Sequence, residues 1–207
     1  MDIHQTRTWV QAIAAAMDQN RDHLTQLDSA IGDADHGVNM QRGFTAVGAA
    51  LDGFQAAGVG EVLVKTGTTL ISSVGGAAGP LYGTFFRATG KQLSGPTADA
   101  EQLAAAFDAG LAGVQKLGAA VPGDKTMVDA LVPALAAFGE SARAGESEAV
   151  AAEKAAVAAE TGAQDTTPLQ ARKGRASYLG ARSIGHQDPG ATSTALVFRA
   201  LAEVLKS

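Results

Sequence analysis

The chain contains 207 residues, of which 46% are apolar and 18% are charged, and it has a formal net charge of −5. This length fits one domain over residues 1–207, and the apolar fraction excludes a wholly disordered chain. Cysteine is absent, which excludes disulfides, zinc–thiolate sites, iron–sulfur clusters and cysteine nucleophiles. The acidic balance argues against a nucleic-acid partner. Because there is no 18-residue apolar run and no apolar signal segment, we expect a soluble cytoplasmic protein with no membrane partner.

Apolar residues recur at helical spacing through most of the sequence, whereas the alternation typical of strands is nearly missing. We therefore predict an all-α bundle of about seven to nine helices around a common core. The Ala/Glu-rich segment 140–167 shows no special chemistry, and we expect a solvated helix and a linker there. The main apolar stripes span residues 9–17, 40–54, 103–117, 128–138 and 196–205.

Glycine and proline gather in a few clusters, and these clusters also contain most of the unusual polar residues. Glycines at helix joints usually mean only that a turn needs positive φ. Because the polar residues share these joints, we expect a functional site in the loops at one end of the bundle. The clusters span residues 32–37, 75–83, 118–123 and 185–190.

Three aspartates, Asp28, Asp33 and Asp35, lie within eight positions around Gly32. Carboxylates about 4 Å apart repel by roughly 4 kcal/mol per pair at an effective dielectric near 20, so a loop that gathers them needs a cation or a raised pKa. An all-oxygen ligand set favours Mg²⁺, Ca²⁺ or Mn²⁺ over zinc, and the spacing does not match an EF-hand. The alternative is a set of capping and turn residues on the surface. His36 is either a phosphate or outer-layer contact or simply an exposed side chain.

Two further loops fit a phosphate ligand. The glycine-rich segment 72–84 is not a Walker loop, but it can present N–H groups at a helix N-terminus; close helix packing explains it equally well. Arg172, Lys173 and Arg175 form a basic run, and a last helix that begins near Pro189 would add free N–H groups. A basic run is usually a solvated surface, but beside a carboxylate–metal loop it is a candidate for neutralising a polyphosphate.

Together these segments resemble the ADP-binding L subunit of dihydroxyacetone kinase, of the type that depends on a phosphotransferase system. The resemblance extends from near Asp28 to the last helix, with the motifs in family order. They read D-x4-DADHG-x-NM-x-RGF from Asp28, TL-x-SSVGGA from Thr69, PGDKTM from Pro122 and ARKGRASYLG from Ala171, followed by residues 183–193.

The resemblance implies an antiparallel barrel of eight helices, with the nucleotide site formed by loops at one end. It also implies that Asp28, Asp33 and Asp35 hold two Mg²⁺ ions and that Arg175 is catalytic, stabilising charge during phosphoryl transfer. One departure is Ala78, which stands where the family commonly has serine, so a hydroxyl contact is lost. The residues implied in binding ADP or ATP are His36, Gly37, Val38, Asn39, Ala77, Ala78, Gly118, Met127, Arg175, Asp188, Pro189 and Gly190.

The resemblance implies a nucleotide-binding kinase subunit that acts with separate partners. In one form, a phosphohistidine donor subunit of the phosphotransferase system rephosphorylates bound ADP, and the phosphoryl group passes to dihydroxyacetone on a K subunit. In the alternative form, ATP exchanges as an ordinary substrate and the acceptor is dihydroxyacetone or a related small ketose. A third hypothesis is a regulatory module that binds a transcription regulator according to its nucleotide state.

Overall fold

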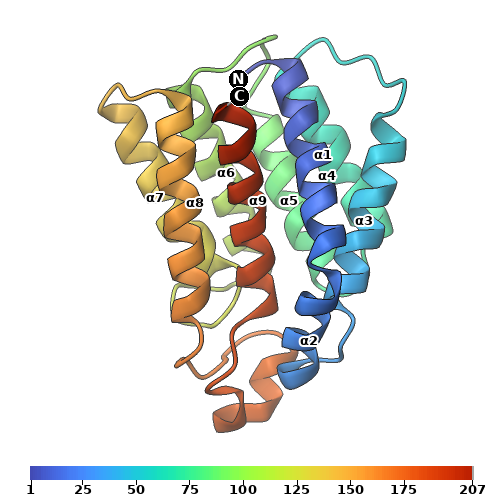
Figure 1. Ribbon diagram of the computed structural model, residues 1–207, viewed down its shortest axis with the longest axis vertical. Helices are drawn as coiled ribbons and strands as arrows, with labels where there is room; N and C mark the ends of the chain where they lie inside the picture. Colours follow the sequence, from blue (N-terminus) through green and yellow to red (C-terminus); the bar gives the residue numbers. More distant parts are fainter. Residues whose placement is uncertain (207) are drawn as a thin grey trace.

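The computed structural model describes residues 1–206, and within them every regular element is helical (Figure 1). Strand-type pairing within these residues is limited to one isolated antiparallel bridge between Asp2 and Thr97. The all-α prediction is therefore confirmed. The elements are α1 (Ile3–Gln19), α2 (Arg21–Ile31), α3 (His36–Leu51), α4 (Val59–Ser73), α5 (Ala78–Gly90), α6 (Ala100–Gly118), α7 (Val128–Arg143), α8 (Glu148–Asp165), the 3₁₀ helix η1 (Arg175–Ser183) and α9 (Pro189–Lys206).

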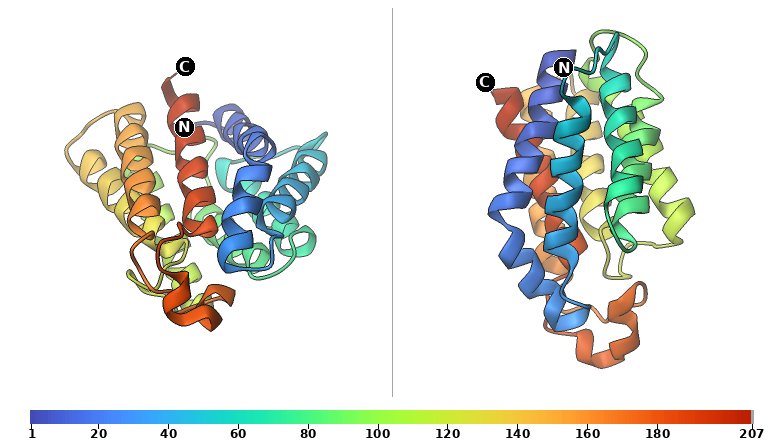
Figure 2. Two further views of the ribbon diagram at one scale, coloured as in Figure 1. Left: turned by 60° about the horizontal axis from the view of Figure 1, so that its bottom comes forward. Right: turned by 90° about the vertical axis from the view of Figure 1, so that its right-hand side faces the viewer.

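The helices run up and down and close into a barrel (Figure 2). α1 and α2 follow each other past Asn20 along the same side, so together they act as one broken segment. Counted this way, the described helices make eight antiparallel segments, as the resemblance implies. The ring closes where α1 meets α9, and there the Trp9 indole Nε1 donates to the Val197 carbonyl oxygen over 2.9 Å.

The barrel interior holds a cluster of aromatic rings. Phe107 on α6 lies at its centre, with ring centroids 5.3 Å from Phe138, 6.0 Å from Phe198 and 6.1 Å from both Trp9 and Phe85. All five side chains are buried, and most of these contacts are edge-to-face, an arrangement that adds to the stabilisation from buried area. Rings from α1, α5, α6, α7 and α9 thus fix the helices relative to one another.

Residues 140–167 correct one prediction. α7 continues to Arg143 and α8 begins at Glu148, and α8 lies against α7 and α9 as part of the core. The expected helix is present, but the prediction that this segment is a solvated helix with a linker, outside the core, is wrong. Alanine gives little hydrophobic signal in a sequence, but its small side chain lets helix backbones approach closely. The fully or almost fully buried alanines of α8 are Ala151, Ala152, Ala155, Ala156, Ala159 and Ala163.

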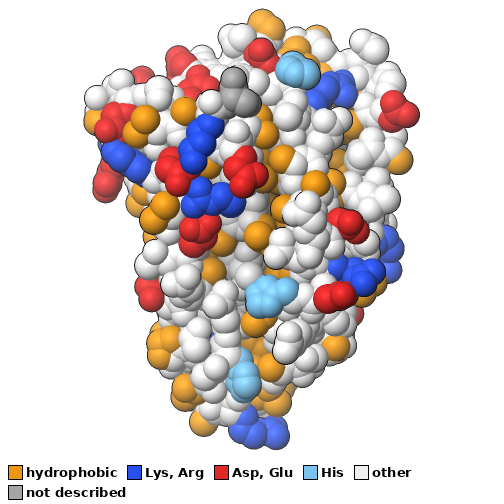
Figure 3. All heavy atoms as spheres, viewed as in Figure 1, with side chains coloured by type: hydrophobic (Ala, Val, Ile, Leu, Met, Phe, Trp, Pro, Cys, Tyr) orange, Lys and Arg blue, Asp and Glu red, His pale blue; other side chains and the backbone are white. Residues whose placement is uncertain are grey.

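Charged side chains reinforce the outer contact between α8 and α9. The Arg199 guanidinium donates to Glu160 over 2.8 Å and to Glu153 over 2.9 Å. On the face shown in Figure 3, acidic and basic side chains gather over this pair of helices. Within residues 1–206, none of the helices combines the length and apolarity required to cross a membrane.

Alternation of helix direction decides which loops share an end. The connections α2–α3, α4–α5, α6–α7 and α8–α9 lie at the lower end in Figure 1, together with η1. The connections α3–α4, α5–α6 and α7–α8 lie at the upper end, near both marked chain termini. All the polar motifs that the sequence singled out therefore belong to the lower end.

Candidate functional site

One open pocket lies among the four lower connections. Its lining residues come from segments 28–39, 75–82, 125–127, 173–176 and 188–190. Three helices, α3, α5 and α9, have N-terminal residues in this lining, and Met127, the N-cap residue of α7, also belongs to it. Each N-terminus carries a partial positive charge of about half an elementary charge, so the pocket favours an anionic ligand.

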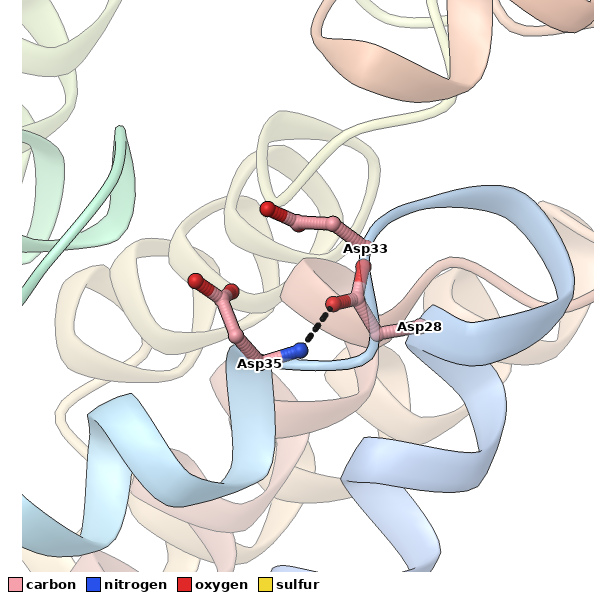
Figure 4. Close-up of side chains that lie close together, drawn as sticks. All are labelled: Asp28, Asp33 and Asp35. Carbon is pink, nitrogen blue, oxygen red and sulfur yellow. Dashed lines mark hydrogen bonds between the residues drawn. The ribbon is translucent and has the colours of Figure 1, made fainter.

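The three aspartates converge at one side of the pocket (Figure 4). Asp28 lies in the last turn of α2, whereas Asp33 and Asp35 lie in the short connection to α3. One carboxylate oxygen from each residue lies within 4.8 Å of the others. The Asp28 Oδ2 atom accepts the N–H groups of Asp35 over 2.8 Å and of His36 over 3.2 Å, so α2 caps the start of α3.

Two glycines allow this close arrangement. A Cβ atom on Gly32 would lie 2.0 Å from the Asp28 Oδ1 atom, and a Cβ atom on Gly37 would lie 2.0 Å from the Arg21 carbonyl oxygen. Between them, Ala34 adopts φ +61°, a left-handed conformation that costs a non-glycine residue about 1 kcal/mol. Packing of α3 against α2 thus fixes the carboxylates close together in spite of their mutual repulsion.

The donor set fits a hard divalent cation. It offers only carboxylate oxygens, Asp33 and Asp35 are exposed, and Asp28 keeps Oδ1 free of the capping bonds made by Oδ2. Oxygen ligands of this kind suit Mg²⁺, which commonly combines one or two carboxylates with phosphate oxygens. A cation here would stand between the carboxylates and an anion that faces the helix N-termini.

A buried hydrogen-bond network joins His36 to α5 and α9. The His36 Nε2 atom lies 2.9 Å from the Ser193 Oγ atom, which lies 2.7 Å from the Tyr82 hydroxyl. The Tyr82 hydroxyl also contacts Thr194 and donates to the Gly190 carbonyl oxygen over 2.9 Å. Burial lowers the pKa of His36 against the opposing effect of nearby Asp28 and Asp35, and burial raises the pKa of Tyr82. The network therefore holds three of the helix N-termini together.

Asp188 caps the last helix. Its Oδ2 atom accepts the Ala191 N–H over 2.7 Å, and its own N–H donates to the Thr166 hydroxyl over 2.9 Å. Burial, together with the nearby Asp129 carboxylate, raises the pKa of the Asp188 carboxyl to about 7. The Ala191 N–H and the Lys125 ammonium act in the opposite direction. Proton binding by Asp188 therefore falls in the neutral range.

Arg175 reaches the acidic loop from the segment between α8 and α9. It begins η1 within a segment that we call the basic arm, residues 171–183, which folds over the lower end of the barrel. Its guanidinium NH2 atom lies 3.0 Å from the Asp33 Oδ2 atom, and its side chain is 67% exposed. Pairing with a carboxylate while largely exposed leaves the guanidinium able to bind an anion in the pocket.

The structure brings most of the sequence-predicted residues together. The pocket lining includes the three aspartates and nine others: His36, Asn39, Ala77, Ala78, Met127, Arg175, Asp188, Pro189 and Gly190.

Three predicted residues lie outside the lining. Gly37 is buried against α2, Val38 is 47% exposed on α3, and Gly118 ends α6 beside Leu81. Sequence reasoning did not single out Tyr82 and Lys125, which do line the pocket, although both lie in segments that it quoted.

Comparison with known proteins agrees with this geometry. Residues 30–203 match the family model described as the DAK2 domain. The chain is 47% identical to the PEP-dependent dihydroxyacetone kinase, ADP-binding subunit DhaL of Escherichia coli, over 98% of this chain and 97% of that protein. It is 41% identical to the PTS-dependent dihydroxyacetone kinase, ADP-binding subunit DhaL of Lactococcus lactis, over 99% of both chains.

A solved structure gives the same result for the fold. The crystal structure of the dihydroxyacetone kinase of C. freundii in complex with AMP-PNP and Mg²⁺ matches with a TM-score of 0.73 and 29% identity. The match covers 96% of this chain and 33% of that longer one. With its helical barrel, its acidic loop and these full-length relatives, the chain belongs to the DAK2 domain family.

Proposed function

We propose that this protein is the nucleotide-binding subunit of a dihydroxyacetone kinase, and that it binds ADP and ATP with Mg²⁺ as a single domain in the cytoplasm. The observation that carries the proposal is the meeting of three helix N-termini with three carboxylates and Arg175 around one pocket. This arrangement separates regions of positive and negative potential within one site. A nucleotide polyphosphate bound with divalent cations satisfies both regions.

The side chains divide the work of binding and transfer. Asp28, Asp33 and Asp35 would hold two Mg²⁺ ions, which neutralise phosphate charge when bound. N–H groups at Ala77 and Ala78 would contact phosphate oxygens, while Met127 and Asp188 border the nucleotide. Backbone donors need no hydroxyl, so Ala78 in place of the family's serine is compatible with binding. Arg175 would stabilise the charge that develops on the transferred phosphoryl group.

The acceptor and the phosphoryl donor would belong to other subunits. Phosphoryl transfer depends mainly on positioning and charge neutralisation, and the pocket offers both. Relatives that match along nearly their full length are named as ADP-binding subunits of PEP- or PTS-dependent kinases. By this likeness, a K subunit would carry dihydroxyacetone, and a phosphohistidine donor subunit would rephosphorylate the bound ADP. Contact with a transcription regulator stays a prediction from the sequence.

A second form of the proposal has ATP exchanging as an ordinary substrate. It is favoured by the likeness to the C. freundii dihydroxyacetone kinase crystallised with AMP-PNP and Mg²⁺, and to rat triokinase/FMN cyclase, which is 38% identical over 90% of this chain. The chain covers about a third of each of those longer proteins, 33% and 32% respectively.

Native mass spectrometry of protein purified in Mg²⁺ without added nucleotide tests the proposal. Retained ADP with two magnesium ions is expected for the form rephosphorylated in place. Empty protein that takes up ATP on addition would favour the exchanging form. Asp33→Asn should lose the bound mass, whereas Asp108→Asn, an exposed carboxylate on α6, should keep it. Protein that binds neither nucleotide in Mg²⁺ would contradict both forms.

A further inference from the structure

Lys125 is a buried ammonium with no direct carboxylate partner among the described residues. It lies just before α7 and is 1% exposed, with φ +63°. Its Nζ atom donates to the carbonyl oxygens of Ser183 over 2.7 Å, Leu169 over 3.0 Å and Thr167 over 3.4 Å. An ammonium has three donors, so these bonds use its full capacity. Burying a charge is costly unless such bonds compensate for it, and the position therefore needs an explanation.

The three carbonyls belong to both ends of the segment that carries Arg175. Thr167 and Leu169 follow α8 and lead into the basic arm, whereas Ser183 ends it. Lys125 therefore joins the start and the end of the segment between α8 and α9 and attaches both to the α6–α7 connection. The Arg172 N–H adds a bond of 3.0 Å to the Asp124 carbonyl oxygen at the same place.

Ser183 strengthens the same attachment, the base of the basic arm, with hydrogen bonds inside the arm. Its hydroxyl accepts the Ala171 N–H over 2.9 Å and donates to the Gly180 carbonyl oxygen over 2.7 Å. With Lys125, it forms a buried polar anchor beneath an otherwise exposed segment. The arm also packs against α2 through a small apolar cluster of Ala171, Ala176 and Leu179 with Ile31.

The tip of the basic arm is held much more weakly than its base. Arg175 reaches Asp33 through a largely exposed ion pair, and such pairs contribute about 0–1 kcal/mol. This is too little to order a segment of this length, because fixing the backbone costs about 1–2 kcal/mol per residue. The position of Arg175 over the aspartates therefore depends on the buried base, together with the small apolar cluster in which the neighbouring Ala176 packs with Ile31.

We infer that Lys125 is a positioning residue for phosphoryl transfer, acting through the basic arm to hold Arg175 over the acidic loop. The inference rests on the proposed function for the role of Arg175, but the anchoring itself does not. Asp28 binds the N–H groups of Asp35 and His36 independently of Lys125. Loss of Lys125 should therefore release the arm while the three aspartates stay in place.

Limited trypsin digestion tests the anchoring without any ligand or partner. The basic arm contains four trypsin sites, after Arg172, Lys173, Arg175 and Arg182. Lys125→Met should speed cleavage within the arm by roughly tenfold, as expected when a local opening becomes about 1.4 kcal/mol easier. Lys91→Met, an exposed lysine at the other end of the barrel, should leave the arm protected. Unchanged arm cleavage in Lys125→Met would overturn the inference.

Turnover in a double-mutant cycle tests the action through Arg175. In the protein reconstituted with K and donor subunits, Lys125→Met should lower turnover by roughly tenfold when Arg175 is present and by less than about twofold in the Arg175→Ala background. Equal losses in both backgrounds would show a general structural effect and would refute the positioning role. If Arg175→Ala alone leaves turnover unchanged, the proposed role of Arg175 fails, while trypsin still decides whether Lys125 anchors the arm.

Ser183→Ala provides a second way to loosen the same anchor, in case Lys125→Met does not fold. It removes one acceptor and one donor from the arm and leaves the Lys125 ammonium bonded. Faster arm cleavage and a loss of turnover that depends on Arg175 are again expected. Full protection of the arm in a folded Ser183→Ala protein would contradict the proposed anchor.

Discussion

The three carboxylates of the acidic loop repel one another, and a single substitution should relieve part of this repulsion. With one oxygen of each aspartate within 4.8 Å of the others, each pair repels by about 1 kcal/mol in a water-like medium and about 3.5 kcal/mol at an effective dielectric of 20. Because Asp33 and Asp35 are exposed, the lower value applies. Asp33→Asn removes two such pairs, a gain of about 2 kcal/mol, and weakens an ion pair with Arg175 that is worth about 1 kcal/mol at most.

We therefore expect Asp33→Asn to stabilise the protein when divalent cations are absent. A net gain of about 1 kcal/mol corresponds to a melting temperature roughly 2–4 °C higher in EDTA and low salt. High salt should shrink this gain, because the Debye length falls to about 3 Å at 1 M. In Mg²⁺ and ADP the order should reverse: ligand at about 100 times its Kd stabilises the unsubstituted protein by about 2.7 kcal/mol, and Asp33→Asn loses this gain.

Scanning calorimetry or thermal melts monitored by circular dichroism in the two buffers measure both effects. Asp108→Asn is the matched control and should follow the unsubstituted protein in each buffer. A lower melting temperature for Asp33→Asn in EDTA would show that the carboxylates do not repel one another as the geometry requires. A full Mg²⁺–ADP shift in Asp33→Asn would refute the cation site itself.

Three other predictions concern the barrel and its lower end. Gly37→Ala should lower the free energy of unfolding by about 1–3 kcal/mol, because its Cβ would collide with the α2 backbone. Gly48→Ala lies on the same helix but faces open space, so it should raise the free energy of unfolding by about 0.5–1 kcal/mol. Equal effects of the two substitutions in denaturant melts would contradict this packing. Ala156→Glu should unfold the protein or lower its melting temperature steeply, because Ala156 is fully buried. Val157→Glu, on the exposed face of α8, should leave the melting temperature measured by circular dichroism nearly unchanged. If both substitutions are tolerated, the packing of α8 in the core is contradicted. Asp188 should give a pH-dependent difference: its folded pKa of about 7 exceeds the ordinary 3.8, so its protonated form contributes up to about 4 kcal/mol of stability below pH 4 that is lost as pH rises to 7. Asp188→Asn has no group that titrates there, so the difference in free energy of unfolding between the two proteins should change between pH 4 and pH 7. A difference that stays constant across this range in EDTA would rule out the raised pKa.

The sequence predicted the helical class and the acidic cluster because both depend on short spacings. Trp9 and Phe107 lie on stripes of helical period, and both are fully buried. Asp28, Asp33 and Asp35 are close in the chain, so one turn between α2 and α3 is enough to gather them. Such features need no knowledge of which distant segments meet.

The features that escaped prediction depend on distant partners or on side chains with weak signals. His36 meets Ser193 across 157 positions, and Tyr82 meets the same serine across 111, so nothing local marks the network that joins them. Lys125 lies in a quoted motif but was not singled out, because its three carbonyl partners are backbone atoms that carry no mark in the sequence. The place of α8 in the core was mispredicted for a different reason. Its alanines permit close helix packing, but they are only weakly apolar, and the glutamates between them suggested a solvated helix.

The two ends of the barrel also differ in how well they should tolerate insertions, because only the lower end carries the pocket. Since direction alternates from helix to helix, every second connection faces away from the pocket, and those connections carry none of its lining residues. One of them is the α7–α8 turn, residues 144–147, where Gly145 has φ +73° and a Cβ atom added to it would meet open space. A reporter domain or affinity tag inserted at that turn would lie a full helix length from the aspartates. The same reasoning makes the upper end the place where relatives of this fold can gain or lose segments without altering how a nucleotide is held.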